Sequence, residues 1–88
     1  MRKFLITYDL LAPGKDYKSL FGAIEGLTGY YWHGMQNIWF VKGNNLTCEY
    51  IIDQLVAHVD ANDKLFACEL DGWWSKGLDQ SGIEWLKS

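Results

Sequence analysis

The sequence predicts a small α+β domain in which an antiparallel sheet of four strands packs against two helices. Four short segments are rich in the β-branched and aromatic residues that favour strands. Two other segments repeat apolar residues with the period of about 3.6 residues that is typical of an amphipathic helix. The 88 residues, of which 49% are hydrophobic, are sufficient to form the core of one such domain.

The predicted strands cover residues 3–10, 30–35, 37–42 and 64–70. Gln36 and Asn37 form the corner of the hairpin between the second and the third strand. The first and third strands are apolar on both faces, which is typical of strands at the centre of a sheet. We therefore expect the second and fourth strands at its edges.

The first helix is expected to begin at the N-cap residue Asp16 and to end near Gly29. Its apolar residues lie at helical spacing: Tyr17, Leu20, Phe21, Ile24 and Leu27. The second helix is expected to begin after Thr47, which is a favourable N-cap. It carries the clearest apolar stripe of the chain: Cys48, Ile51, Ile52, Leu55, Val56 and Val59. Both stripes predict helices that pack against the sheet.

The predicted order of elements is strand, helix, strand, strand, helix, strand. This is the order of the ferredoxin-like βαββαβ sandwich, whose right-handed crossovers place both helices on one face of the sheet. We assign this core to residues 1–70 and a C-terminal extension to residues 71–88, within a single domain. The spacing of Ser81 and Glu84 matches a capping box and predicts that a short last helix begins there.

The composition argues against several classes of protein. The net charge of −3 and the scattered basic residues do not suit binding of long duplex nucleic acid, which depends on clustered Lys and Arg. No segment approaches the roughly 18 apolar residues of a membrane helix. The first apolar run stops at Thr7, too early for a signal peptide. We expect a cytoplasmic protein (or one of the host cytoplasm, if viral) with Cys48 and Cys68 reduced in the core.

Asp9 is the first candidate for a functional residue, because it ends an apolar central strand just before a loop that contains a glycine. A carboxylate in this position can bind a hard cation such as Mg²⁺, which takes one or two carboxylates together with waters and phosphate. A two-fold dimer that brought two copies of Asp9 together would form such a site. The structural alternative is that Asp9 accepts hydrogen bonds from backbone N–H groups of the loop.

Histidines and lysines provide further candidates. His33 can act as a general acid or base, since imidazole titrates near neutral pH, but a strand histidine is also typical of a structural hydrogen bond. We expect His58, beside the apolar stripe of the second helix, to be structural. Lys15 and Lys42 can meet a phosphate, although solvated lysines are the alternative, and the phosphate-binding-loop signature is absent.

Aromatic residues are concentrated on the predicted hairpin and in the extension. Neighbouring residues of a strand point to opposite faces, so half of this group must leave the core. Exposed Trp and Tyr mark partner surfaces or platforms for stacked bases. The alternative is that the last segment of the chain folds back and covers them. The candidate ligand-binding residues are Tyr8, Lys15, Trp32, Trp39, Trp73 and Trp74.

The first strand, with Tyr8 and Asp9 at its end, and the order of the elements resemble the small CRISPR-associated adaptation nuclease family. That resemblance implies a ferredoxin-like homodimer in which Asp9 is the metal-site residue. Nearly the whole chain also resembles the SinR-like proteins of bacteria and phages. This second resemblance implies almost nothing about function. It rests on Tyr8–Leu10, Pro13–Tyr17, Trp32–His33, Trp39, Asn62–Leu65 and Glu84–Leu86.

Three functions are compatible with these observations. The first is a small homodimeric binding module, without a cofactor, that recognises a nucleotide-like ligand or a protein partner in conflict between phage and host. The second is a metal-dependent endonuclease or phosphodiesterase that uses Mg²⁺ at Asp9, with His33 as the second candidate catalytic residue. The third is a structural or regulatory interaction domain. We expect the binding module.

Overall fold

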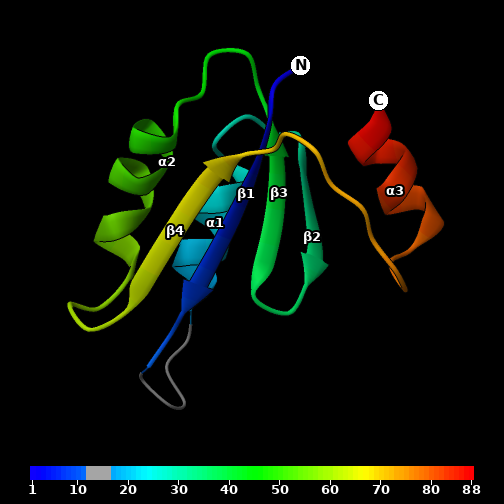
Figure 1. The fold of residues 1–88 in the computed structure, drawn as a ribbon. Helices are drawn as coiled ribbons and strands as arrows, with labels where there is room; N and C mark the ends of the chain where they lie inside the picture. Colours follow the sequence, from blue (N-terminus) through cyan, green and yellow to red (C-terminus); the bar gives the residue numbers. More distant parts are fainter. Residues whose placement is uncertain (12–16) are drawn as a thin grey trace.

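The computed structural model describes residues 1–11 and 17–88 (Figure 1). Its elements are β1 (Lys3–Asp9), α1 (Lys18–Glu25), β2 (Tyr31–Met35), β3 (Ile38–Lys42), α2 (Cys48–Leu55), the short 3-10 helix η1 (Val56–His58), β4 (Lys64–Glu69) and α3 (Gln80–Lys87). The predicted α+β class is confirmed. Within the two described ranges, no helix has the length and apolar character that crossing a membrane requires.

The four strands form one antiparallel sheet with the order β2–β3–β1–β4. The two strands that are apolar on both faces, β1 and β3, therefore lie at its centre. Leu5 of β1 is opposite Phe40 of β3 on one side and Cys68 of β4 on the other. The register shifts between Trp32 and Met35, so that pairing is irregular along the edge strand β2.

Helix α1 lies behind the sheet in Figure 1, α2 is seen beside β4, and both helices pack against the same face of the sheet. In β1, every second residue from Phe4 to Tyr8 is buried, because alternate side chains point toward this face. The buried core consists of Phe4, Ile6, Tyr8, Leu20, Ile24, Trp39, Val41, Leu46, Ile51 and Leu55. Each large apolar side chain that is fully buried contributes about 1.5–3 kcal/mol, so this face holds the main core of the domain.

Helix α2 begins where the sequence predicts. The hydroxyl of Thr47 accepts a hydrogen bond from the N–H of Tyr50 at 3.1 Å, which caps the helix. The predicted continuation to Val59 is wrong in detail, because the α-helix ends at Leu55 and η1 continues it for one tighter turn.

Helix α1 ends earlier than its apolar spacing predicts. Its last residue is Glu25, whose carbonyl accepts a hydrogen bond from the N–H of Gly29 at 3.3 Å. Gly29 has a φ angle of 82°, a conformation that glycine adopts without strain, so it closes this end as expected. The predicted N-cap, Asp16, lies outside the described residues.

Helix α3 packs against the opposite face of the sheet, beside β2 and β3 (Figure 1). The ring of Trp32 lies between the sheet and this helix, with its centroid 5.3 Å from that of Phe40 and 6.5 Å from that of Trp85. Gly82 is buried against the same ring, where an added Cβ would overlap with a carbon of the Trp32 indole. The C-terminal segment therefore covers the sheet of its own chain, and only a glycine fits at this contact.

The predicted start of the last helix is wrong. The helix begins at Gln80 with Asp79 at the N-cap, so that Ser81 lies inside its first turn. With this start, Gly82 and Leu86 are four residues apart on one helical face, and both are buried. The observed start of α3 therefore fits the packing of this face on the sheet, and it does not fit the capping-box spacing of Ser81 and Glu84.

Replacing Gly82 by Ala should lower the free energy of unfolding by about 1–2 kcal/mol. Overpacking against the Trp32 ring costs about 1–3 kcal/mol, and the higher helix propensity of Ala returns up to about 1 kcal/mol of this. Urea unfolding followed by circular dichroism measures the change.

Gly22→Ala is the matched control. Gly22 also lies within a helix, and nothing is within 4 Å of an added Cβ there, so this variant should gain about 0.5–1 kcal/mol from propensity alone. Equal gains in both variants would contradict the close packing of α3 on Trp32.

Candidate functional site

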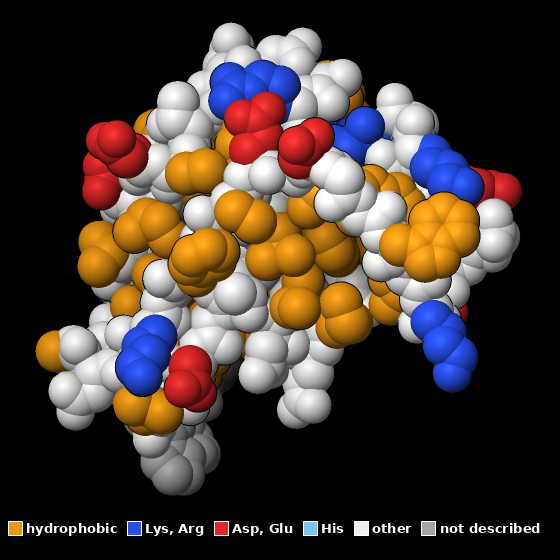
Figure 2. All heavy atoms as spheres, viewed as in Figure 1, with side chains coloured by type: hydrophobic (Ala, Val, Ile, Leu, Met, Phe, Trp, Pro, Cys, Tyr) orange, Lys and Arg blue, Asp and Glu red, His pale blue; other side chains and the backbone are white. Residues whose placement is uncertain are grey.

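The face of the sheet that carries α3 is only partly covered. On the side of β1 and β4, Phe66 is 60% exposed, and Leu5, Thr7 and Cys68 are partly exposed. We call these four residues the open strip. Figure 2 shows hydrophobic side chains gathered across the middle of this face. Contiguous exposed apolar surface of this kind is typical of binding sites.

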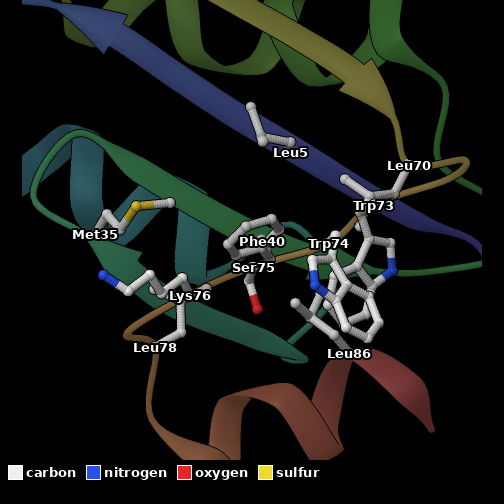
Figure 3. A pocket seen from close by; sticks show the side chains of 10 residues that line it. All are labelled: Leu5, Met35, Phe40, Leu70, Trp73, Trp74, Ser75, Lys76, Leu78 and Leu86. Atoms are coloured by element: carbon white, nitrogen blue, oxygen red, sulfur yellow. The ribbon is translucent and has the colours of Figure 1, made fainter.

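A groove of about 320 Å³ lies between the sheet and segment 70–78, which joins β4 to α3. Its lining comes from the sheet, the segment and the helix (Figure 3): Leu5, Met35, Phe40, Leu70, Trp73, Trp74, Ser75, Lys76, Leu78 and Leu86. The volume lies at the lower end of the range of about 300–1,000 Å³ that small-molecule sites occupy. The groove is therefore large enough for a small ligand.

The structure brings two of the predicted ligand-binding residues together in this groove, Trp73 and Trp74. Trp74 is 92% exposed, whereas Trp73 is half-buried. In Figure 3 the two indole rings lie at the same end of the groove. Gly77, with a φ angle of 84°, then turns the chain toward α3. The exposed indole of Trp74 leaves a large aromatic face available for contact.

Trp32, another predicted ligand-binding residue, is not part of the groove lining. Its ring stacks on Phe40 and is covered by Gly82 and Trp85 of α3. Phe40 does line the groove, so Trp32 supports the site from the side that α3 covers.

Tyr8, Trp39 and His33 form an aromatic cluster on the other face of the sheet. The indole N–H of Trp39 donates to the hydroxyl of Tyr8 at 3.1 Å, and this hydroxyl donates to the carbonyl of Gln36 at 3.3 Å. The ring of His33 stacks on Trp39 with centroids 4.1 Å apart, and its Nε2 is 3.1 Å from the same carbonyl. These contacts hold the hairpin corner, which is the structural role considered for His33.

Burial separates Tyr8 and Trp39 from the groove. They are 6% and 3% exposed, and the polar atoms of their side chains bond to protein groups. Burial raises the pKa of the Tyr8 phenol above its ordinary value, and the hydrogen bond from Trp39 opposes this shift. Both residues serve the core in this structure.

Asp9 is exposed at the end of β1, where it is opposite Lys64 of β4. In the ranges 1–11 and 17–88, no group of three or more His, Cys, Asp or Glu side chains is placed to hold a metal ion. The Mg²⁺ site and the nuclease function at Asp9 stay predictions. Lys15, also predicted to bind a ligand, lies outside the described residues.

Lys42 is covered by α3 and does not face solvent as a phosphate-binding residue would. It is 5% exposed, its ammonium nitrogen lies 4.3 Å from the ring centroid of Trp85, and it donates to the hydroxyl of Ser88. Burial lowers the pKa of the Lys42 amine, and the positive charge of Lys3 adds to the effect. Lys42 thus takes part in docking α3 on the sheet.

Two residues of the SinR-like pattern contact each other. The carboxylate of Asp63 accepts a hydrogen bond from the hydroxyl of Tyr17 at 3.2 Å. It also accepts bonds from the backbone N–H groups of Leu11 and Asp60, both at 2.8 Å. Asp63 therefore ties together the segments that follow β1, precede α1 and precede β4, which is a structural task.

Sequence reasoning missed most of the groove. Ser75, Lys76 and Leu78 follow the two tryptophans without a recognisable motif, and Leu5 and Phe40 read only as buried strand residues. For the open strip beside the groove one signal was present: β4 alternates Leu65 and Ala67, which pack toward the core, with Phe66, which is apolar but points the other way.

The buried Tyr8 phenol makes stability depend on pH in the alkaline range. The unfolded chain ionises at the ordinary tyrosine pKa of about 10, whereas the folded chain ionises at a higher pH because burial raises the pKa of Tyr8. The contribution of the neutral Tyr8 phenol to the free energy of unfolding is fully present below a pH of about 10. It is lost as the pH rises, by up to about 1.4 kcal/mol per pH unit.

In Tyr8→Phe this alkaline loss should be smaller than in the wild type. At neutral pH the variant should be less stable by about 1–3 kcal/mol, since the buried indole N–H of Trp39 loses its partner. Urea unfolding between about pH 8 and 11 tests both effects, with Tyr50→Phe, an exposed tyrosine, as the control. An identical pH dependence of Tyr8→Phe and wild type would show that Tyr8 ionises as freely as in the unfolded chain.

Comparison of the sequence with protein-family models, and of the chain with curated proteins and with solved structures, yields no match. The resemblances to the SinR-like proteins and to the CRISPR-associated nuclease family therefore rest on the residues quoted above and stay predictions.

Proposed function

We propose that this chain is a small binding module and that its site is the groove between the sheet and segment 70–78. The observation that carries this proposal is the position of Trp74, which is 92% exposed and lies at a groove lined mainly by apolar side chains. Covering an exposed indole removes a large apolar area from water, which favours binding.

A flat aromatic ligand suits this site best. Stacking of a base on an aromatic side chain contributes about 1–3 kcal/mol, and Trp74 presents such a platform beside Trp73. The nucleotide-like ligand expected from the sequence has a flat base, so it is the first class of ligand to test. The anionic groups of a nucleotide can meet Lys76 in the same groove.

The composition of the groove favours binding over catalysis. Its described lining residues include the hydroxyl of Ser75 and the amine of Lys76, but no carboxylate, imidazole or thiol that could serve as a partner base or a stronger nucleophile. Asp9 and His33 do not line it. The metal-dependent nuclease would therefore need a separate site at Asp9.

The alternative occupant is a protein partner, such as the second copy of the chain expected from the sequence. It is favoured by Phe66, which is 60% exposed on the open strip but does not line the groove. A protein surface would cover both the strip and the groove, whereas a small ligand would fill only the groove.

We also propose the ferredoxin-like sandwich as the finer description of residues 1–70. The strand order β2–β3–β1–β4 and the alternation of strands with α1 and α2 support it. On this view α3 is an addition to the sandwich that builds one wall of the groove.

Trp74→Ala should weaken binding of the best nucleotide in a panel of nucleoside monophosphates about tenfold or more, because the stacking platform is lost. Isothermal titration calorimetry measures the affinity, and circular dichroism checks that the variant remains folded. Phe66→Ala is the control, since Phe66 is exposed on the same face outside the groove.

The affinities of Trp74→Ala and Phe66→Ala distinguish a nucleotide in the groove from a protein partner on the whole face. A nucleotide that binds wild type and Trp74→Ala equally would refute a site at Trp74. A partner whose binding depends on Phe66 as strongly as on Trp74 would indicate a protein on the whole face.

Asp9→Asn should leave nucleotide binding unchanged, because Asp9 lies outside the groove lining. The same variant tests the nuclease in an assay with Mg²⁺ and labelled oligonucleotides. Cleavage by the wild type that is lost in Asp9→Asn would establish the alternative function; cleavage that persists in the variant would exclude Asp9 as its metal residue.

A further inference from the structure

The groove has one charged residue in its lining. Eight of the ten lining residues are apolar, and the other two are Ser75 and Lys76. Lys76 is exposed, and within the described part of the chain its ammonium group makes no ion pair or side-chain hydrogen bond. An apolar groove with a single unpaired cation is electrostatically complementary to a ligand with one negative group.

The positions of the lining residues separate the aromatic from the charged part of the groove. In Figure 3 the indoles of Trp73 and Trp74 lie at one end, the ammonium of Lys76 lies toward the Met35 end, and Phe40 is between them. A flat ring that contacts Phe40 and the two indoles can therefore place an attached anionic group toward Lys76.

The apolar lining also restricts the ring of the ligand. Besides the side chains of Ser75 and Lys76, the polar side-chain groups of the lining are the indole N–H donors of Trp73 and Trp74. A polar ring edge placed inside the groove would lose its water and find few partners, which costs about 1–3 kcal/mol for each unpaired group. A ring without hydrogen-bonding edges avoids this cost.

We propose that the groove binds an aromatic monoanion: an apolar ring system that packs on Phe40, Trp73 and Trp74, with a single carboxylate or similar group that pairs with Lys76. This inference rests on the proposed binding function, and it names an apolar aromatic acid, in place of a nucleotide with its polar base edges, as the chemical class of ligand that the groove favours. Trp74 supplies the aromatic contact, and Lys76 selects the sign of the charge.

Three probes of nearly equal shape test the charge preference: 2-naphthoate, 2-naphthylmethanol and 2-naphthylmethylammonium. Titrations followed by ¹⁵N–¹H NMR give the affinity of each probe, and the indole N–H signals of Trp73 and Trp74 report where it binds. We expect 2-naphthoate to bind about five-fold tighter than the neutral alcohol, because an exposed ion pair contributes up to about 1 kcal/mol, and the ammonium probe to bind least.

Lys76→Ala should abolish the preference for 2-naphthoate over the alcohol, because it removes the cation that distinguishes the two probes. Lys64→Ala is the matched control, because Lys64 is an exposed lysine on the same face that does not line the groove. Raising the salt concentration should reduce the preference in the wild type and in Lys64→Ala.

The outcomes separate this inference from the proposed function. Equal affinity of the wild type for the anionic and neutral probes, a preference that survives in Lys76→Ala, or shifts that avoid both indoles would overturn the inference. If none of the naphthyl probes binds while a nucleotide binds at Trp74, the inference falls and the binding function stands. If neither kind of ligand reaches the groove, both fall.

Discussion

The two central strands, β1 and β3, point apolar side chains to both faces of the sheet. Other segments of this chain of 88 residues therefore have to cover both faces. Helices α1 and α2 cover one face and form the main core. Among the residues that the structure describes, α3 and segment 70–78 are the ones that cover the other face. The core, the docking of α3 and the groove all follow from this requirement, because apolar strand surface is stable only when it is removed from water.

The two faces are covered in different ways, and this difference separates the structural core from the proposed binding site. On the helical face, Tyr8 and Trp39 satisfy the polar atoms of their side chains within the protein, and together with His33 they fix the hairpin corner. On the other face, the single helix leaves the open strip and an apolar groove beside an exposed indole. A fully packed second face would have left no place for a ligand.

The sequence predicted the strands, both core helices and the central place of β1 and β3, because binary pattern and turn residues act locally. It also pointed to Trp73 and Trp74. It failed where tertiary contacts decide: the start of α3 agrees with the fit of Gly82 on Trp32 rather than with a local capping signal. Leu86 lines the groove only because α3 docks where it does, and no local pattern encodes that position.

Leu86 has a double role, since it anchors α3 on the sheet and also forms a wall of the groove. Local opening of α3 and occupation of the groove are therefore linked equilibria: a ligand that requires the wall binds only the closed form. Occupation would slow hydrogen exchange throughout α3, including amides far from any ligand atom. In such an arrangement, hydrogen exchange in α3 reports whether the groove is occupied.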